Sequence, residues 1–295
     1  MNGDRASEPI WVVMRCRNDI GIVERTCKAV KEQRHPLKLL VMDNHSTDGS
    51  REVLEHYADR LIDVPEGTYV PGRVLNQAMR ETTGEVVVFL NSDCPPLDGE
   101  WLEKLVQPFV QEKVCATFGC QEPRVDCWPL FAKDTLDTFG DGLRQKFWRH
   151  CFSMASSAIR RSVWEESAFR EDIQYSEDID WTWRQRGRGY RIQYVPQSRV
   201  EHSHNYTLAQ FRKRQYGEGK ADAQIFEWSD WESGWVRYSF LPFARQVLND
   251  TKYCLRKGEM SSLFHSPLLR WNQMMGRRKG FLEGLESKRS RGTEK

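Results

Sequence analysis

Short apolar runs alternate with helical patterns along most of the chain up to residue 205. The runs predict strands at 11–14, 37–42, 61–64, 85–90, 114–119 and 190–195, with 152–159 as a further candidate. The patterns between them predict helices at 19–33, from the turn at 46–49 to 57, and at 71–82, 101–111 and 176–186. This alternation is typical of a mostly parallel α/β sheet. The run at 85–90 is apolar on both faces, which indicates a central strand.

The pattern changes at two places. Residues 123–149 contain many aromatic residues and glycines without regular spacing, which predicts a loop-rich insert. Beyond residue 206 the chain predicts helices at 207–227 and 235–255, followed by a basic, mixed stretch whose end we expect to fray over about the last ten residues. We therefore predict an α/β domain over residues 1–205 and a C-terminal helical region over 206–295.

Composition excludes several classes of protein. The net charge of +2 is too small to indicate a nucleic-acid partner. The eight cysteines form no C-x-x-C pair, which argues against a zinc knuckle, and without a signal-peptide pattern we expect reduced thiols in the cytoplasm. The apolar run at 86–90 is far shorter than the ~20 residues that span a bilayer. We expect a soluble protein or one that lies peripherally at the inner face of a membrane.

Polar side chains follow two of the predicted strands. Asp43 ends the second strand, and Asn91, Ser92 and Asp93 follow the fourth. Ligands of open α/β sheets bind beyond the carboxyl ends of the strands, where Asp43 can accept the imide N–H of uracil or thymine and Asp93 can hold a hard cation. Alternatively these residues only form turns and cap helices, which is their commonest role.

An acidic cluster and a histidine pair are the other candidates. Glu177, Asp178 and Asp180 open a predicted helix, where acids complement the helix dipole, but three acids in four residues exceed that need. Crowding them raises the pKa of at least one, which suits a general base. His202 and His204 follow the last predicted strand and face the same side if the segment is extended, which favours a metal ligand.

Taken in order, the motifs resemble a family-2-type glycosyltransferase of the GT-A (Rossmann-like) fold. The motifs are VMDNHSTDG at 41–49, GRVLN at 72–76, GEVVVFLNSD at 84–93 and SEDIDW at 176–181. The stretches GCQEP at 119–123 and HSHNYT at 202–207 resemble the rhamnosyltransferase branch, as do SPLLR at 266–270 and the pair at 276–277 more loosely. The resemblance implies an inverting transferase with Mg²⁺ or Mn²⁺ as cofactor. Its donor would be a nucleoside-diphosphate sugar of the UDP or dTDP type, and its acceptor a saccharide or a lipid-linked saccharide.

The resemblance also implies roles for single residues. Asp178 matches the catalytic base, and Asp93 with His202 matches the metal site, although the pattern alone leaves His202 and His204 open. The residues matching the nucleotide-sugar site are Arg15 in the loop after the first strand, Asp43, Arg73, Asn91 and Ser92. Arg73 would pair with the diphosphate, unless it is an ordinary solvated helix arginine.

Two departures from the family pattern bear on the donor. Asn91 replaces the first aspartate of the D-x-D motif, so the ribose contact is neutral and the metal site carries one negative charge less. Arg17 precedes Asn18 where the family often has tyrosine, and its guanidinium can meet the donor phosphates. These departures leave the identity of the donor open.

Two other classes of protein share parts of this pattern. A sugar nucleotidyltransferase needs a glycine-rich loop after the first strand, and residues 14–19 contain no glycine. A non-catalytic nucleotide-sugar-binding protein would not need Asp93, Asp178 and His202 together. Separately, the segment 268–285 mixes large apolar residues with four basic ones. It predicts either a packed helix with a solvated basic face, which its short apolar stripe favours, or contact with an anionic membrane.

Overall fold

The computed structural model describes residues 9–145 and 148–293. The chain divides into two compact units, which we call the sheet unit and the helical unit. The sheet unit contains the described residues up to Arg124, together with Thr135–Ile173 and Glu177–Ser203, and the helical unit contains Val125–Asp134, Gln174–Ser176 and the chain from His204 onward. Residue 205 as a boundary between separately folding domains stays a prediction.

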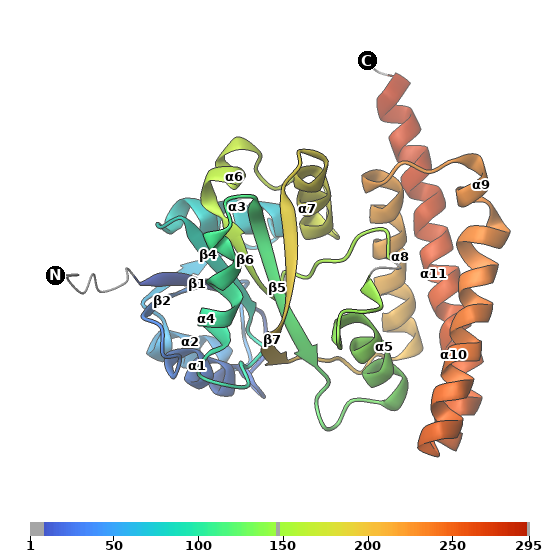
Figure 1. The fold of residues 1–295 in the computed structure, drawn as a ribbon, viewed down its shortest axis with the longest axis horizontal. Coiled ribbons are helices and arrows are strands. Elements are labelled where there is room, and N and C mark those ends of the chain that lie inside the picture. Colours follow the sequence, from blue (N-terminus) through green and yellow to red (C-terminus); the bar gives the residue numbers. More distant parts are fainter. Residues whose placement is uncertain (1–8, 146–147, 294–295) are drawn as a thin grey trace. The chain divides into compact units, whose positions relative to one another are not determined.

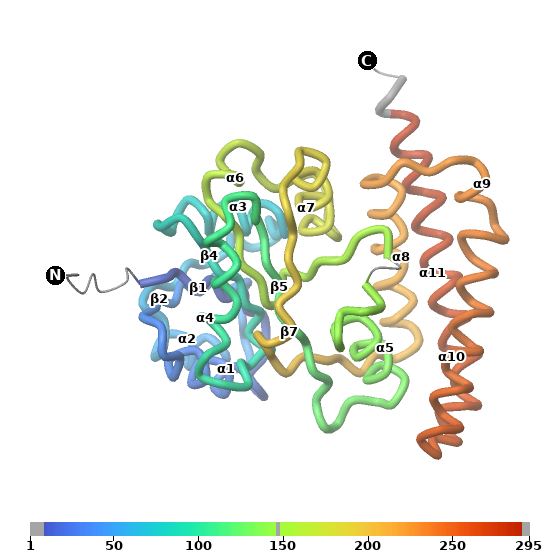
Figure 2. Tube along the Cα trace, in the orientation of Figure 1, coloured from blue at the N-terminus to red at the C-terminus, as the bar shows by residue number. Residues whose placement is uncertain are grey.

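One seven-stranded sheet forms the centre of the sheet unit, as Figures 1 and 2 show. Its strands are β1 (Ile10–Cys16), β2 (Leu37–Asp43), β3 (Arg60–Asp63), β4 (Val86–Asn91), β5 (Val114–Glu122), β6 (Ser156–Arg160) and β7 (Arg191–Glu201). Their order is β3-β2-β1-β4-β6-β5-β7. Only β6 among these strands runs antiparallel to its neighbours, β4 and β5. The predicted mostly parallel sheet, with 85–90 as a central strand, is confirmed.

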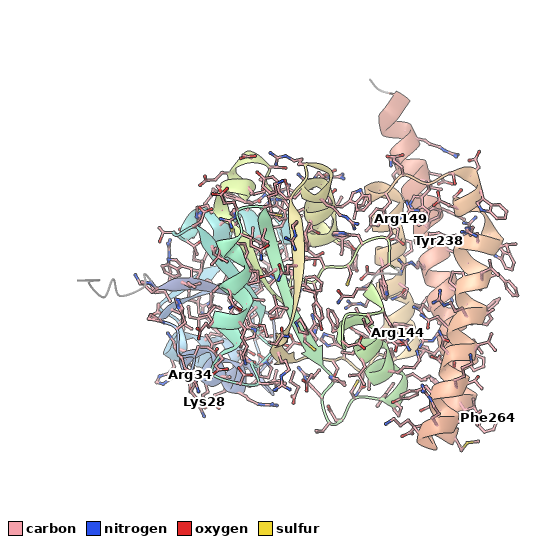
Figure 3. The ribbon with its side chains drawn as sticks, in the orientation of Figure 1. Lys28, Arg34, Arg144, Arg149, Tyr238 and Phe264 are labelled. Carbon is pink, nitrogen blue, oxygen red and sulfur yellow. The ribbon has the colours of Figure 1, made fainter. Side chains whose placement is uncertain are left out.

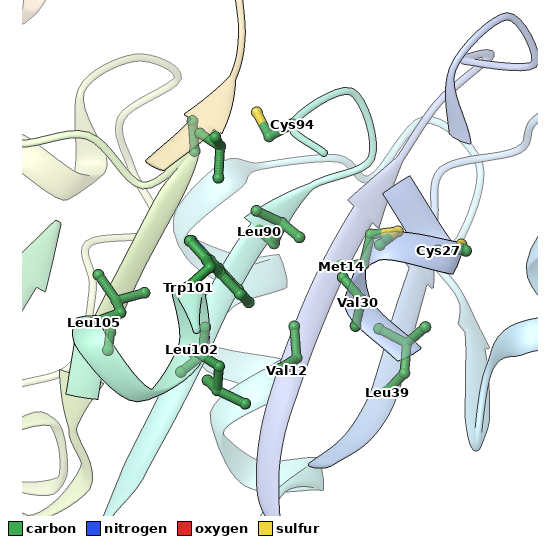
Figure 4. Close-up of a cluster of buried hydrophobic side chains, with 14 of the residues drawn as sticks. Val12, Met14, Cys27, Val30, Leu39, Leu90, Cys94, Trp101, Leu102 and Leu105 are labelled. Carbon is green, nitrogen blue, oxygen red and sulfur yellow. The ribbon is translucent and has the colours of Figure 1, made fainter. Parts of the chain in front are cut away.

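Helices cover both faces of this sheet. They are α1 (Val23–Lys31), α2 (Ser50–Tyr57), α3 (Pro71–Glu81), α4 (Trp101–Val106), α6 (Arg161–Glu166) and α7 (Glu177–Gly187). Successive strand residues point to opposite faces. Accordingly Val12 packs in one core with α1, α2 and α4, whereas Val13 packs in the other with α3, α6 and α7. Figure 4 shows the first core, in which Trp101 of α4 lies near Leu90 of β4.

The register of the parallel strands gathers the polar strand ends at one edge. Cys16 of β1 pairs with Asp43 of β2, and Arg15 pairs with Asn91 of β4. The segment after β4 continues to β7, where Pro96 forms an antiparallel bridge with Val200. Residues that lie far apart in sequence are thereby brought beside one another where β1, β4 and β7 end.

Several predicted elements needed correction. The stretch 123–149 is not only loop, because α5 (Pro129–Phe139) lies inside it. The strand candidate at 152–159 is the shorter, antiparallel β6. Strand β7 continues to Glu201, well past the predicted end at residue 195. Helix α11 (Met260–Thr293) runs through residues 286–293, and residues 294–295 lie outside the described part of the chain, so fraying of this end stays a prediction. These errors concern segments whose conformation depends on partners distant in sequence.

Long helices form the helical unit. They are α8 (Leu208–Ile225), the short α9 (Asp230–Ser233), a π-helical turn (Val236–Phe240), α10 (Leu241–Lys257) and α11. Tyr238 stacks on Phe281 with ring centroids 3.8 Å apart, and Figure 3 labels Tyr238 beside α10. Within the described residues, none of the helices combines the length and the apolarity needed to cross a bilayer.

Helices α8 and α11 approach each other so closely that only glycine fits. A Cβ atom at Gly280 would lie 1.9 Å from the carbonyl oxygen of Tyr216, and one at Gly219 would lie 2.0 Å from that of Arg277. Gly276 and Gly284 make the same kind of approach, so one glycine per helical turn of α11 faces α8. The backbones pack directly, as in other helix pairs with small residues at the contact.

The Gly280→Ala variant is expected to destabilise the chain by about 1–3 kcal/mol, because the added methyl group forces the two helices apart. Gly187 in α7 is a matched control, since a Cβ there would have nothing within 4 Å. Alanine at Gly187 should leave the free energy of unfolding unchanged or raise it by up to about 1 kcal/mol. Chemical denaturation of both variants measures the difference, and equal effects would contradict the close approach.

A buried ionic cluster joins three segments of the helical unit. The Arg270 guanidinium of α11 is 1% exposed and donates to Asp250 (2.7 Å) and Asp134 (2.7 Å). Lys133 lies 3.1 Å from Asp250, and the Ser266 hydroxyl donates to the same carboxylate at 2.6 Å. Two positive and two negative side chains therefore compensate one another; Lys133, Asp250 and Arg270 are buried, and the Asp134 side chain is 30% exposed.

Candidate active site

Two candidate metal ligands meet at the edge where β4 and β7 end. Asp93 follows β4 and is 8% exposed, and His202 follows β7. Nε2 of His202 lies 3.5 Å from Oδ2 of Asp93. A carboxylate and an imidazole at this separation can share one divalent cation, because typical ligand distances are about 2.0–2.2 Å on each side. His202 belongs to the sheet unit and His204 to the helical unit, and which of the two histidines binds a cation stays a prediction.

The orientation of His202 is fixed by Gln121 at the end of β5. Nδ1 of His202 lies 2.7 Å from Oε1 of Gln121, and the amide nitrogen of Gln121 donates to the Ser153 hydroxyl at 2.8 Å. With its nitrogen engaged by Ser153, Gln121 offers an acceptor, so the imidazole donates from Nδ1. Its lone pair is then on Nε2, on the side of Asp93, as in metal sites whose histidine is held by an outer hydrogen bond.

Arg124 adds a positive charge beside Asp93. Its Nη2 donates to the backbone oxygen of Asp93 at 2.8 Å and lies 3.5 Å from the carboxylate. Its Nε is buried and has no hydrogen-bond partner within the described chain. One carboxylate and one imidazole leave most positions of a divalent ion open, which suits a cation that also binds phosphates. The residues therefore fit Mg²⁺ or Mn²⁺, and Arg124 extends the positive field next to them.

The acids at the start of α7 occupy different environments. Both oxygens of Asp178 accept backbone N–H groups, Oδ2 from Met154 (2.9 Å) and Oδ1 from Ile179 (2.8 Å). Asp180 is buried and paired with Arg184 at 2.8 Å and with Arg170 at 3.4 Å. Hydrogen bonds to a carboxylate favour its ionised form and hold its direction. Asp178 is therefore oriented and half-buried, whereas Asp180 has a structural ion pair.

Glu177 is the acid whose proton affinity is raised. Its carboxyl group is buried and lies 3.5 Å from Nη1 of Arg15. Burial, followed by repulsion from Asp178, raises the pKa of Glu177 to about 7 despite the attraction of Arg15. The expected raised pKa is that of Glu177, with burial as the larger cause and repulsion from Asp178 as the second.

Arg15 connects the acidic cluster with the end of β4. It is the sixth residue of β1 rather than part of the following loop, which corrects the predicted position. Its Nη2 donates to Oδ1 of Asn91 at 3.0 Å. Burial alone would lower the pKa of Arg15, but Tyr69, Glu177 and Asp178 outweigh it and the pKa is raised. Arg15 therefore stays charged between the two groups.

The remaining predicted residues have structural partners. Asp43 is completely buried, and its carboxylate accepts from the Ser46 hydroxyl (2.6 Å) and N–H (3.2 Å), which is the turn-forming role that the sequence left open. The Ser92 hydroxyl is bonded to Asp19. Arg73 is half-exposed, and its Nε lies 3.4 Å from a carboxylate oxygen of Glu171. Direct contacts of Asp43, Ser92 and Arg73 with a nucleotide sugar stay predictions.

The Glu177→Gln variant is expected to remove a pH dependence of stability. Because the folded-state pKa of Glu177 is raised from 4.5 to about 7, its contribution is complete below about pH 4.5 and is lost as the pH rises through about 7. The shift corresponds to at most about 3 kcal/mol. Thermal unfolding between pH 5 and 8 should show the variant gaining stability relative to the unchanged protein. Glu66→Gln, at an exposed glutamate, is the control, and parallel curves for both variants would contradict the assignment.

Sequence reasoning missed Gln121 and Arg124 as members of the site. Gln121 lies in the segment GCQEP that was noted for its family resemblance, but only the distance to His202 reveals what it does. Arg124 follows that segment directly and had no pattern of its own. The position of β5 beside β7 brings both residues to the edge where Asp93 lies.

Comparisons with known proteins find a matching family and similar structures. A family model described as Glycosyl transferase family 2 matches residues 11–167. The chain is 29% identical over 204 residues to the O-antigen chain rhamnosyltransferase WbaN of Salmonella anatum, covering 64% of each chain. It is 28% identical over 208 residues to the O-antigen chain rhamnosyltransferase RfbN of Salmonella typhimurium, covering 65% of each. The match thus spans slightly less than two thirds of these relatives.

Among solved structures, the fold is similar to that of the mannosyltransferase PcManGT from Pyrobaculum calidifontis, determined in complex with GDP-Man and Mn²⁺. The TM-score is 0.61 at 19% sequence identity, and the alignment covers 96% of this chain and 88% of that one. At this level of identity the likeness concerns the fold.

Proposed function

The chain belongs to glycosyl transferase family 2, and we propose that it transfers a sugar from a nucleoside-diphosphate sugar to an acceptor hydroxyl with inversion at the anomeric carbon. The sheet unit has the GT-A fold. The main support for this proposal is that Asp93 and His202 lie 3.5 Å apart at the edge of the sheet. The same unit contains Asp178, whose carboxylate is oriented by a backbone hydrogen bond. The proposed sugar is rhamnose, as in the names of the two similar curated proteins.

Asp93 and His202 are the proposed ligands of Mg²⁺ or Mn²⁺. When bound, the cation neutralises charge on the departing nucleoside diphosphate. The protein itself brings Oδ2 of Asp93 within 3.5 Å of Nε2 of His202. Gln121 orients the imidazole, and Arg124 adds a positive charge beside Asp93. The Mn²⁺ in the mannosyltransferase complex supports this choice of ion.

Asp178 is the proposed general base. The acceptor oxygen forms a bond to the anomeric carbon, the bond from that carbon to the phosphate oxygen breaks, and the hydroxyl proton passes to Asp178. The two backbone N–H groups that donate to Asp178 hold its carboxylate in a fixed direction. General-base assistance of this kind contributes about 10²–10⁴-fold to rate.

The donor site is proposed to combine a base contact with ribose and phosphate contacts. Asp43 would select a uracil or thymine base, hence a UDP or dTDP sugar, after the Ser46 turn opens. Asn91, presented by Arg15, would bind the ribose, with Ser92 beside it, and Arg73 would reach the diphosphate. The acceptor is proposed to be a saccharide, free or lipid-linked. The proposed location is the cytoplasm and, for a lipid-linked acceptor, the inner face of the membrane.

A panel of nucleotide sugars tests the function. Thermal unfolding with dTDP-rhamnose, UDP-sugars and GDP-mannose, each with and without Mn²⁺, should show stabilisation by a UDP or dTDP sugar that depends on the cation. Release of free nucleoside diphosphate in the presence of acceptor saccharides measures turnover. Stabilisation by GDP-mannose alone would overturn the proposed base contact of Asp43. Release of pyrophosphate from a nucleoside triphosphate and a sugar phosphate would indicate a nucleotidyltransferase instead.

A further inference from the structure

Helix α10 leaves a row of leucines uncovered. Leu241, Leu248 and Leu255 recur every seven residues and therefore lie along one face of the helix. Their exposed fractions are 49%, 62% and 62%. The other side of the helix supplies Cys254, which is completely buried in a core with Leu269 of α11. Helix α10 is thus packed on one side and apolar on the side that faces water.

Basic side chains run beside the leucines. Arg245 and Lys252 are exposed and follow Leu241 and Leu248 by four residues. Arg256 is also exposed and follows Lys252 by four residues, so the three basic residues lie on the adjoining face. The only acid of α10 is Asp250, which is completely buried and paired with Arg270 at 2.7 Å. The uncovered face of α10 therefore combines three leucines with three positive charges and no negative charge. We call these six residues the leucine-arginine face.

Large apolar side chains also follow this face at the end of the helix. Met260 and Phe264, in the first turns of α11, are 50% and 80% exposed. Figure 3 labels Phe264 at the end of the two helices where α10 connects to α11. An apolar row with adjoining basic residues is the pattern of helices that lie in the plane of a membrane interface.

The segment named from the sequence, 268–285, has a different role in the structure. Leu269 and Phe281 are buried, and Arg277 is paired with Asp222 of α8. Packing within the helical unit accounts for these residues, whereas Leu268, Trp271 and Leu282 of the same segment are 51%, 50% and 43% exposed. Membrane contact of this segment stays a prediction, and it is on α10 that exposed leucines recur every seven residues beside basic side chains.

We propose that the leucine-arginine face docks the protein on an anionic phospholipid surface. A second copy of the chain is a poorer occupant, because a two-fold contact would press the same three positive charges against one another. An anionic bilayer supplies both an apolar layer for the leucines and phosphate groups for the basic residues. The inference deepens the proposed function, since it brings the enzyme to a surface where a lipid-linked acceptor resides.

Flotation of the full chain with lipid vesicles tests the docking. Vesicles of phosphatidylcholine mixed with phosphatidylglycerol should carry the protein, whereas pure phosphatidylcholine should not. The Arg245→Glu/Lys252→Glu variant is expected to weaken binding at least about tenfold, because two charges attracted to the anionic surface become two that it repels. The Leu248→Glu/Leu255→Glu variant should weaken binding at least about tenfold as well, because it places two carboxylates where the apolar layer would be contacted. Raising the salt concentration should weaken binding of the unchanged protein in the same direction.

Matched control variants distinguish an effect specific to the leucine-arginine face from a general effect of added negative charge. Leu282→Glu alters another exposed leucine of the helical unit, and Arg212→Glu/Lys213→Glu makes the same change of charge on α8. Both controls should bind vesicles like the unchanged protein. Equal loss in the controls, or no flotation of the unchanged protein, would overturn the proposal. So would self-association in solution that is abolished by Leu248→Glu/Leu255→Glu, because the face would then be an interface between copies.

The flotation result is independent of the transferase assignment. Stabilisation of the unchanged protein and of Leu248→Glu/Leu255→Glu by nucleotide sugars, measured without vesicles, reports the donor site alone. Loss of flotation with intact donor binding in that variant supports the docking face. Donor binding that is absent in both proteins, together with normal flotation of the unchanged one, would count against the proposed function and leave the docking face standing.

Discussion

The Asp178→Asn variant is expected to turn over at least about 100 times more slowly than the unchanged enzyme, while its affinity for the donor stays nearly the same. The reason is that the carboxylate acts on the acceptor proton as the new bond forms, whereas the donor is held by other residues. Steady-state release of nucleoside diphosphate gives the turnover, and titration with the donor gives the affinity.

Asp178→Asn is also expected to lower the stability of the protein. Asp178 accepts two backbone N–H groups with its two oxygens, and asparagine can accept only with one. A loss of about 1–3 kcal/mol in stability is therefore expected as well, and thermal unfolding must show that the variant is folded at the assay temperature. Asp180→Asn is the matched comparison, since it should weaken the ion pair with Arg184 without a comparable loss of turnover in the folded fraction.

Two outcomes would contradict the assignment of the base. Normal turnover of Asp178→Asn with a large loss in Glu177→Gln would place proton transfer on the neighbouring buried acid. A parallel loss of turnover and donor affinity in Asp178→Asn would mean that the residue shapes the donor site instead of acting in the transition state.

Chelation by EDTA is expected to abolish transfer, and Mg²⁺ or Mn²⁺ should restore it. The Asp93→Ala variant should lose the part of donor binding that depends on the cation, because it removes the only carboxylate of the proposed pair with His202. Calorimetric titration with Mn²⁺ alone, followed by titration with the donor, separates ion binding from donor binding.

Histidine variants decide which imidazole is the ligand. His202→Ala should lose cation affinity, and His204→Ala should retain it, since it is His202 that Gln121 orients toward Asp93. Gln121→Leu removes this orientation and is expected to weaken Mn²⁺ binding by about 10–100-fold. Full activity in EDTA would sink the metal assignment and leave stabilisation of the leaving group to a guanidinium, that of Arg73 or of Arg124.

The sequence predicted those elements that depend on the pattern of apolar and polar residues within one segment. The run at 85–90 is apolar at every position from Val86 to Leu90, so its place at the centre of the sheet followed from composition alone. The polar residues after it were found for the same reason, because a strand end and a polar turn are adjacent in sequence. Their mutual distances were not predictable, since they depend on the register between β1 and β4 and on the way the chain after β4 reaches β7.

The roles of the three acids at 177–180 illustrate what sequence cannot distinguish. Glu177, Asp178 and Asp180 have similar side chains, and their different behaviour comes from neighbours supplied by β1, by the chain before β6 and by residue 170. Arg170 neutralises one acid, and Arg15 approaches another. Helix α5 and the long α11 were not predicted either. They are stabilised by contacts between residues distant in sequence, such as the contact of Arg270 with Asp134.

The ionic cluster around Arg270 has a consequence for how this chain can change in evolution. Loss of Arg270 alone would leave the buried Asp250 carboxylate with Lys133 as its remaining charged partner. Breaking a buried ion pair in this way costs about 3–5 kcal/mol, so residues of α5, α10 and α11 cannot change independently. Among relatives, loss of the arginine should coincide with substitution at position 134 or 250. Covariation of positions 134, 250 and 270 among relatives would show that α5, α10 and α11 depend on one another.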